Sequence, residues 1–237
     1  MSKPKVYVKW CSDGETAGKG DVAIVVDVLR ACTTVITAFS MGARRCKVTT
    51  EVGQARQIAR RRKAILIGER NNKRIAGFDF GNSPGQLQRE KIDGATIVFT
   101  STNFPHALAA AAEAIHILLG ALVNLSAVCQ AVHTLAINSK TNIGLVLAGE
   151  PSERHAKEDY YFAGRAARLL AKTCALDRSA RKAVAEVGKC SEQEMISCSV
   201  HARELEEDSF GQDVRHAFMV DAFNIVPRLA NGWLTVA

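Results

Sequence analysis

The sequence has little of what marks membrane, secreted or zinc-finger proteins. Only 6% of its 237 residues are aromatic, and its most apolar long stretch, 107–123, is interrupted by Glu113 and His116. That stretch does not qualify as a membrane span, and the first residues lack the apolar segment of a signal peptide. The seven cysteines form no Cys-x-x-Cys pair, so neither a zinc site nor a disulfide framework is indicated. We therefore expect a cytoplasmic protein with reduced thiols and no membrane partner.

What is present describes a globular chain. Hydrophobic residues make up 47% of the sequence and charged residues 23%, with no repeat or linker tract. We expect one domain over 1–237, with a core over about 1–175 and a C-terminal extension over about 176–237. The 31 lysines and arginines against 24 acidic residues give a net charge of +7, which suits an anionic partner. Charge alone does not choose between a phosphorylated metabolite, a nucleic acid and a membrane surface.

Short apolar runs alternate with segments of helical period, which predicts an α/β fold. The predicted strands are 6–8, 23–28, 46–49, 64–67, 96–100, 115–119 and 143–148. The predicted helices between them are 30–40, 52–62, 105–114, 125–136 and 158–173. Several strands are almost continuously apolar, as in strands covered on both faces. We expect a mostly parallel sheet flanked by helices.

The last third of the chain changes character. Ser191 and Glu194 form a capping-box pattern that opens a polar helix running through His201 to Glu207. A second helix is predicted over 213–221, followed by a short strand before Pro227. We expect these elements to pack on the core as an α+β C-terminal extension.

Polar residues follow the predicted strands where each strand ends. They are Asp27, Arg30, Thr33 and Thr34 after the second strand, Glu69 after the fourth, 100–103 after the fifth, Asn124 after the sixth and Glu150 after the seventh. An open parallel sheet forms its ligand crevice at the carboxyl ends of its strands. We expect these side chains to line one crevice.

Asp27 is a single carboxylate in an apolar strand, so it needs a cation or hydrogen-bond donors to stay ionised. A metal ion meets that need, and so does an ion pair with Arg30 that only ties the strand to its helix. Arg30, Thr33 and Thr34 lie at a helix start, where guanidinium, hydroxyl and amide groups bind phosphate. Ordinary helix capping is the alternative for the two threonines.

The segment 100–103 adds three hydroxyls, Thr100 and Thr102 among them, and the Asn103 amide before another helix start, a set that suits a dianionic phosphate. Glu69 and Asp79 are candidates to join Asp27 around Mg²⁺, which takes one or two carboxylates plus waters and phosphate oxygens.

Asn82 and Ser83 lie in a Gly-Asn-Ser-Pro turn and become ligand candidates if that turn covers the crevice. For Glu69 and Asp79, the alternative to binding a metal is that each is a salt-bridge or loop residue.

Glu158 and Asp159 open a helix, where paired carboxylates can bind metal or move a proton. Acidic residues in a first turn are also favoured by the helix dipole alone, so both interpretations stay open. His155 and His201 are possible proton carriers, although a surface or packed histidine is the simpler interpretation. The basic run 60–63 is interpreted as a solvated helix end rather than a nucleic-acid site, since no aromatic residue interleaves it.

Several motifs, taken in order, resemble one known family. They are VVDVLRACTTV, GER at 68–70, GFDFGNSP at 77–84, TSTN at 100–103, LAG followed by KED, and the tail HARELEEDSFGQDV…VDAFNIVP. Together they resemble the 2-phosphosulfolactate phosphatase (ComB) family over nearly the whole chain. One departure is Phe104-Pro105, which stands where the family usually has Gly-Thr; a second is the continuation of the Ala-Gly loop as 150–154.

The resemblance implies a Mg²⁺-dependent phosphatase that converts 2-phosphosulfolactate to sulfolactate, a step of coenzyme M synthesis. The positions that match the family motifs are Asp27, Arg30, Glu69, Asp79, Asn82, Ser83, Thr100, Thr102, Asn103, Glu158 and Asp159. We expect Asp27 and Arg30 to be catalytic. The expected metal ligands are Asp27, Glu69, Asp79, Glu158 and Asp159, and the expected substrate ligands are Thr33, Thr34, Asn82, Ser83, Thr100, Thr102 and Asn103.

Catalysis is then positioning and electrostatics around the phosphate. Direct attack by water is favoured over an aspartyl-phosphate, because Leu29 stands where a haloacid-dehalogenase-type enzyme needs a second aspartate. Arg70 and Arg154 are candidates to pair with a sulfonate or carboxylate. The alternatives are a phosphatase for another small phosphorylated acid, a non-catalytic binder of such a metabolite, and a nucleic-acid-binding protein; a homo-oligomer is also open.

Overall fold

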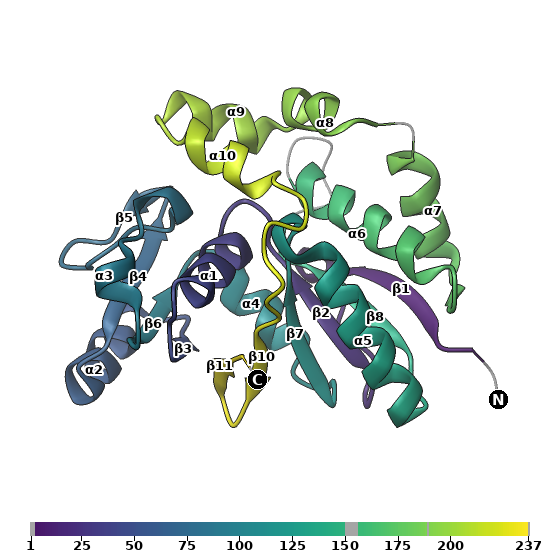
Figure 1. Cartoon of the computed structure of the whole chain (residues 1–237), viewed down its shortest axis with the longest axis horizontal. Helices are drawn as coiled ribbons and strands as arrows, with labels where there is room; N and C mark the ends of the chain where they lie inside the picture. Colours follow the sequence, from purple (N-terminus) through teal and green to yellow (C-terminus); the bar gives the residue numbers. More distant parts are fainter. Residues whose placement is uncertain (1–2, 150–155, 189, 237) are drawn as a thin grey trace.

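Eleven strands of the described residues form one mixed sheet (Figure 1). The computed structural model describes residues 3–149, 156–188 and 190–236. The strands are β1 (Lys5–Trp10), β2 (Val22–Val26), β3 (Arg45–Val48), β4 (Ile65–Arg70), β5 (Lys73–Arg74), β6 (Thr96–Thr100), β7 (His116–Gly120), β8 (Ile143–Leu147), β9 (Ala175–Leu176), β10 (Arg228–Ala230) and β11 (Trp233–Thr235). Their order across the sheet is β5-β4-β6-β3-β11-β10-β7-β2-β8-β1-β9.

Five of the helices lie close to the positions predicted between the strands, whereas the helices that begin at Arg89 and Arg178 were not predicted. The helices are α1 (Ala31–Ser40), α2 (Val52–Arg62), α3 (Arg89–Ile92), α4 (Phe104–Ala110), α5 (Leu125–Ser139), α6 (Lys157–Leu170), α7 (Arg178–Val187), α8 (Glu192–Cys198), α9 (Val200–Glu207) and α10 (Gly211–Ala217). Three short 3₁₀ helices are η1 (Cys11–Asp13), η2 (Pro84–Gln86) and η3 (Leu122–Asn124). The predicted α/β class and mostly parallel sheet are confirmed.

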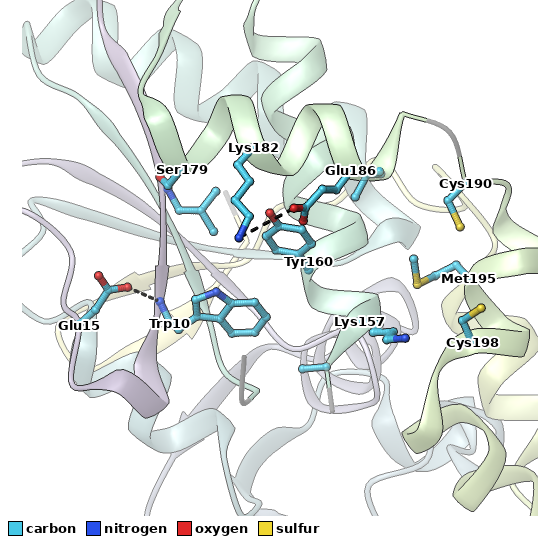
Figure 2. Close-up of a pocket in the computed structure, with 13 residues that line it drawn as sticks. Trp10, Glu15, Lys157, Tyr160, Ser179, Lys182, Glu186, Cys190, Met195 and Cys198 are labelled. Atoms are coloured by element: carbon cyan, nitrogen blue, oxygen red, sulfur yellow. Dashed lines mark hydrogen bonds and ion pairs between the residues drawn. The ribbon is translucent and has the colours of Figure 1, made fainter. Parts of the chain in front are cut away.

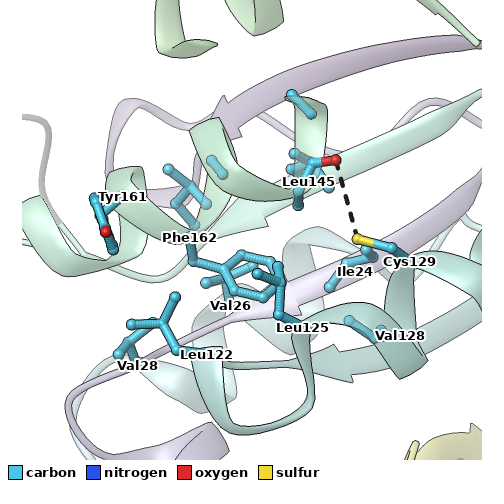
Figure 3. Packing of buried hydrophobic residues seen from close by; sticks show 14 of the residues in the cluster. Ile24, Val26, Val28, Leu122, Leu125, Val128, Cys129, Leu145, Tyr161 and Phe162 are labelled. Atoms are coloured by element: carbon cyan, nitrogen blue, oxygen red, sulfur yellow. Dashed lines mark hydrogen bonds between the residues drawn. The ribbon is translucent and has the colours of Figure 1, made fainter. Parts of the chain in front are cut away.

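The central strand β2 explains why apolar runs mark this fold. Val22, Ile24 and Val26 pack in one core cluster, whereas Ala23 and Val25 pack in the other. Successive strand residues point to opposite faces, so a strand with helices on both faces must be apolar throughout. Helices α5, α6 and α7 cover the first face, and α1 and α4 cover the second. Figure 3 shows the first face, where Phe162 of α6 packs among side chains from the strands and α5.

The C-terminal hairpin joins two parallel halves of the sheet. β3, β6 and β4 run parallel to one another, as do β7, β2, β8, β1 and β9. Between the halves, β10 pairs antiparallel with β7 and β11 pairs antiparallel with β3. The strand predicted before Pro227 was placed wrongly, since the strands follow this residue. Proline lacks the amide hydrogen of a ladder, and the chain enters the sheet one residue later.

The other C-terminal elements lie across one end of the sheet (Figure 1). The capping box is confirmed: Ser191 Oγ accepts from the Glu194 amide, and Glu194 accepts from the Ser191 amide. The predicted single polar helix is two helices, because Ser199 ends α8 and caps α9 through the Ala202 amide at 3.0 Å. This turn directs α9 toward the carboxyl ends of the parallel strands.

Candidate active site

The predicted crevice at the strand ends is a two-lobed cavity. Its lobes have volumes of about 260 and 210 Å³ and share four lining residues, namely Asp27, Leu29, Asn103 and His201. Asp27 follows β2, Asn103 follows β6, and His201 comes from α9. One lobe is further lined by Gly149, Ala156, Glu158, Asp159 and Glu204; the other is lined by Arg30, Glu69, Asn71, Asn72, Asn82, Ser101 and Thr102. Residues that are far apart in the sequence therefore meet at one edge of the sheet.

Asp27 lies at the junction of the two lobes and is 8% exposed. Its Oδ1 accepts a hydrogen bond from the Ala31 amide at 3.0 Å, and its carbonyl accepts from the Cys32 amide at 2.9 Å. Asp27 thus caps α1 and occupies amides that were expected to be free for phosphate. Burial raises the pKa of Asp27 to about 6, and the charges of Glu69 and Glu158 add to the rise.

Arg30 pairs with an acid from the other end of the chain. Its Nη1 lies 3.0 Å from Oδ2 of Asp213, and both side chains are 2% exposed. The guanidinium also lies over the ring of Phe210, with Cζ 4.1 Å from the ring centroid. The partner of Arg30 is therefore Asp213 and not Asp27, so Asp27 does not serve as the structural counter-ion of Arg30.

Glu69 organises the loops of the second lobe. Its Oε1 accepts from both the amide and the hydroxyl of Thr102, at 2.9 and 3.1 Å. Its Oε2 accepts from the Asn72 amide at 3.0 Å. Glu69 is 6% exposed, and these three donors stabilise its buried charge. The carboxylate thereby holds the chain after β6 against the turn after β4.

The acidic pair at the start of α6 has two different environments. Asp159 accepts from the Val28 amide at 2.7 Å and the Gly149 amide at 3.2 Å. Burial raises the pKa of Asp159 well above its usual range, and the charges of Asp27 and Glu158 act in the same direction. Asp159 therefore ties together the chain ends that follow β2 and β8.

Glu158 faces α9 instead. Its Oε2 accepts from Ser199 Oγ at 2.8 Å, and its Oε1 lies 3.4 Å from Nδ1 of His201. Burial alone lowers the pKa of His201, but the hydrogen bond and the charge of Glu158 outweigh this, and the net shift is upward. His201, with its raised pKa, therefore lies at the junction of the two lobes.

Two buried polar atoms around the second lobe have no hydrogen-bond partner among the described residues. They are Oδ1 of Asn82 and Oγ of Ser101. A buried polar group without a partner costs on the order of 1–3 kcal/mol, so such atoms in a cavity indicate a ligand that completes them. The hydroxyl of Ser101 is a donor suited to a phosphate oxygen, and the Asn82 oxygen suits a cation or a donor.

The structure does not bring every predicted ligand to this cavity. Thr33 donates its hydroxyl to the Val28 carbonyl at 2.7 Å, and Thr34 is fully buried without lining the cavity. Ser83 donates to Asp213 at 2.9 Å. Thr100 accepts from Arg70 at 3.1 Å and is likewise fully buried. None of these four residues lines the cavity, whereas Thr102 and Asn103 do.

Asp79 lies at the opposite end of β4 from Glu69. Its Oδ2 accepts from the Leu66 amide at 2.8 Å, and the residue is exposed. The flanking Phe78 and Phe80 are buried in the core, so Asp79 between them faces solvent. The structure therefore separates Asp79 from the other predicted metal ligands.

Arg70 and Arg154 were predicted to pair with a sulfonate or carboxylate group of the substrate. The guanidinium of Arg70 binds the carbonyls of Glu69 and Thr50 and does not line the cavity. Glu150, Arg154 and His155 lie outside the described residues. Asn124, also predicted at a strand end, uses its side chain to bind the Ala121 amide and backbone carbonyls within the fold.

The oxygen atoms around the cavity determine whether it can hold a divalent cation. Within residues 3–149, 156–188 and 190–236, no three His, Cys, Asp or Glu side chains converge as a ready ligand group. Mg²⁺ commonly binds through only one or two carboxylates, with waters and substrate oxygens completing its shell. The second oxygen of Asp27 and the unpaired Oδ1 of Asn82 line the same lobe and fit that pattern. Glu69 and Asp159 already accept hydrogen bonds at both carboxylate oxygens.

Of the residues that the C-terminal segment contributes to this site, only His201 was named from the sequence as a candidate. Phe210, Asp213 and Glu204 come from segments interpreted as packing elements. A signal existed for all three, because the tail motif HARELEEDSFGQDV contains them. Asp213 is only 1% exposed. Its role needs the tertiary structure, because its partner Arg30 is 183 positions away.

The largest described cavity lies elsewhere, between β1 and helices α6, α7 and α8 (Figure 2). It has a volume of about 630 Å³, and Trp10 stacks on Tyr160 along its wall with ring centroids 5.8 Å apart. Its polar groups pair with one another: Lys182 lies 3.8 Å from Glu186, and Glu15 accepts from the Trp10 amide (Figure 2). Neither of these two pairings in the larger cavity leaves a buried polar group without a partner.

The fold and the cavity define an α/β protein with a polar, acid-rich crevice at the carboxyl ends of its parallel strands. The family described as 2-phosphosulpholactate phosphatase matches residues 12–232. A probable 2-phosphosulfolactate phosphatase of Caldanaerobacter subterraneus subsp. tengcongensis is 34% identical over 217 residues, covering 88% of both chains. Proteins of the same description from Thermotoga petrophila and Deinococcus radiodurans are 36% and 35% identical, covering 89% and 90% of this chain and 89% of each relative. The chain belongs to the 2-phosphosulfolactate phosphatase family.

No helix within the described part of the chain is long and apolar enough to cross a membrane.

Proposed function

We propose that the protein is a Mg²⁺-dependent phosphatase that hydrolyses the phosphate monoester of a small acid, with 2-phosphosulfolactate as substrate. The observation that carries the proposal is the cavity that joins Asp27, Arg30 and the unpaired polar atoms of Asn82 and Ser101. Family membership supports the reaction class. The substrate name is that of the relatives and is transferred to this chain as part of the proposal.

The charge of the cavity supports a requirement for a metal cation. Its acidic lining residues are Asp27, Glu69, Glu158, Asp159 and Glu204, whereas its basic lining residues are Arg30 and His201. A dianionic phosphate that also carries carboxylate and sulfonate groups is repelled by that excess of negative charge at close range. A divalent ion held by Asp27 would offset part of this negative charge and leave Arg30 to bind the phosphate.

In this proposal the chain's own residues bind either the metal ion or the phosphate. Bound Mg²⁺ supplies charge neutralisation at the phosphate and a site for an attacking water. Asp27 and Asn82 hold the ion. Arg30 and the Ser101 hydroxyl bind phosphate oxygens and stabilise the charge that develops there. Leu29 lines both lobes where a second aspartate would be needed to act on a leaving group, so we propose direct attack by water rather than an aspartyl-phosphate.

A non-catalytic binder is the second candidate, because Phe104 and Pro105 depart from the family pattern beside the segment 100–103. Phe104 is fully buried and packs edge-on against Phe99, with ring centroids 5.9 Å apart. The departure therefore adds core packing and does not fill the cavity, which favours catalysis over binding alone.

The basic residues at the end of α2 are better explained by the helix dipole than by a nucleic-acid site. Arg60, Arg61 and Arg62 lie in the last turn of the helix, and Lys63 is its C-cap. Cations there interact favourably with the helix dipole. They lie outside the residues that line the cavity.

The test is phosphate release from a panel of small phosphorylated acids, including racemic 2-phosphosulfolactate, with Mg²⁺ or with EDTA. We expect release that needs Mg²⁺ and is lost in Asp27→Asn, and that persists in Asp13→Asn, an exposed aspartate outside the cavity. Equal release with EDTA would reject the metal requirement. Absence of release from every compound, with ligand binding retained by folded protein, would favour the non-catalytic binder.

A further inference from the structure

Asp213 forms hydrogen bonds with two segments beside the second lobe, which is the lobe lined by Arg30, Asn82 and Ser101. Its Oδ2 accepts from Nη1 of Arg30 at 3.0 Å. Its Oδ1 accepts from Ser83 Oγ at 2.9 Å and from the Gly85 amide at 3.0 Å. The two oxygens of one carboxylate thus join the start of α1 to the turn that carries Asn82.

A second contact from the same segment fixes the plane of the guanidinium. Phe210 precedes α10, and its ring lies 4.1 Å from Cζ of Arg30. An unrestrained arginine side chain samples many rotamers, and ordering it costs conformational entropy. Here the ring and the carboxylate hold the side chain before any ligand arrives.

The remaining donors of Arg30 are left without a partner in the described part of the chain. Of its guanidinium nitrogens, only Nη1 has a hydrogen-bond partner among the described residues, and Arg30 lines the lobe that contains Asn82 and Ser101. Asp213 itself does not line the cavity. Any effect of Asp213 on a bound phosphate must therefore pass through Arg30 or through the 82–85 turn.

We propose that Asp213 is a positioning residue that acts through Arg30: it orients the guanidinium toward the phosphate and keeps Asn82 beside it. The inference rests on the proposed function for the identity of the ligand. Its physical basis is preorganisation, since a charged donor held in the bound geometry loses little entropy when the ligand binds. The C-terminal segment is then part of the binding machinery as well as a cover for the sheet.

The experiment is a double-mutant cycle with Asp213→Asn, Arg30→Met and the double variant. Each is measured by titration with inorganic phosphate in the presence of Mg²⁺, and by kcat and KM on the substrate found in the panel. Asparagine keeps an oxygen for Ser83 and Gly85 but removes the charge that holds Arg30. We expect Asp213→Asn to weaken phosphate binding by about tenfold or more, because hydrogen bonds to charged groups contribute at this scale.

The coupling is the decisive readout. If Asp213 acts through Arg30, then Asp213→Asn produces no further loss of phosphate affinity in the Arg30→Met background. Equal losses in both backgrounds would overturn the inference, because a general structural role is additive. Phe210→Leu serves as an independent variant that releases Arg30 without leaving a buried charge unpaired; we expect weaker phosphate binding here also, and unchanged binding would count against the inference.

Asp221→Asn is the matched control. Asp221 lies in the same C-terminal segment and caps α5, accepting from the amide and hydroxyl of Ser126 at 2.7 and 2.6 Å. It lines neither lobe. We expect a lower thermal midpoint with unchanged phosphate affinity. A matching loss of affinity in this variant would show that any damage to the segment suffices, and would overturn the specific role of Asp213.

Results that contradict the proposed phosphatase activity differ from those that contradict the positioning role of Asp213. A wild-type protein that binds inorganic phosphate but releases none from any ester contradicts the phosphatase proposal, while the binding cycle still tests Asp213. Additive losses in an active enzyme contradict only the positioning role. Wild-type protein that neither binds nor releases phosphate contradicts both.

Discussion

Leu234 of β11 is the antiparallel register partner of Cys46 of β3, and both side chains are fully buried in the same core cluster. The pair lies where the two parallel halves of the sheet would otherwise leave open edges. β10 completes the bridge through Arg228, which is the partner of Leu118 on β7. A hairpin from the last ten residues therefore joins the two parallel halves of a sheet whose other strands lie between Lys5 and Leu176.

Leu234→Ala tests the contribution of this bridge. Removing a fully buried leucine side chain leaves a cavity, and we expect a loss of about 2–5 kcal/mol in the free energy of unfolding. Urea unfolding followed by circular dichroism measures the change. Val236→Ala is the control, because Val236 is 37% exposed and its truncation should cost well under 1 kcal/mol. Equal effects of the two substitutions would contradict a buried bridging role.

We expect substitution of glycine by alanine to change stability in opposite directions at Gly164 and at Gly53. A Cβ on Gly164 in α6 would lie 2.6 Å from Cβ of Val187 and 2.7 Å from the Ala183 carbonyl oxygen of α7. We expect Gly164→Ala to destabilise the protein by about 1–3 kcal/mol through overpacking. Gly53 in α2 has no atom within 4 Å of such a Cβ, so Gly53→Ala should stabilise by about 0.5–1 kcal/mol. Thermal unfolding of both variants checks the signs.

His216 links stability to pH. Its Nε2 lies 3.0 Å from Thr37 Oγ1, and burial lowers the pKa of His216 although the charge of Asp213 opposes the shift. The unfolded chain, with an ordinary histidine pKa near ~6.5, therefore binds a proton at a higher pH than the folded protein does. Stability from this group is present above that pH and is lost as the pH falls through and below it.

The corresponding variant is His216→Gln, which keeps a polar group near Thr37 but cannot titrate. Between pH 7 and 5, we expect wild type to lose more stability than this variant in urea titrations at each pH. Parallel curves for the two proteins would show that His216 does not contribute to the pH dependence.

The thiols should react in the order of their exposure. Cys198 is exposed, whereas Cys32, Cys46 and Cys129 are buried. Burial raises the pKa of Cys129 to about 12, and it also raises that of Cys46, so neither forms the reactive thiolate near neutral pH. With a disulfide reagent in the native state, we expect Cys198 to be modified rapidly and these three only after unfolding. Peptide mapping by mass spectrometry identifies the sites, and early labelling of Cys46 would contradict the core described here.

The strand ends show how far local pattern predicts a site. Asp27, Glu69 and Asn103 were identified because each follows an apolar strand, and the carboxyl ends of parallel strands meet at one edge. The structure gathers them around one cavity. The direction of a hydroxyl is not set by that rule. Thr33 and Thr100 lie at the same edge but bond to the surrounding chain, because a buried hydroxyl takes the nearest acceptor or donor.

By itself the sequence determined the alternation of strands and helices, the parallel core and the edge at which polar residues collect. These follow from side-chain period and from the right-handed crossover of parallel strands, which are local or general properties. Only the tertiary structure decided that Asp213 holds Arg30 and that the C-terminal hairpin lies between β3 and β7. Such pairings join residues some two hundred positions apart, and they depend on how the whole chain packs rather than on any pattern near either partner.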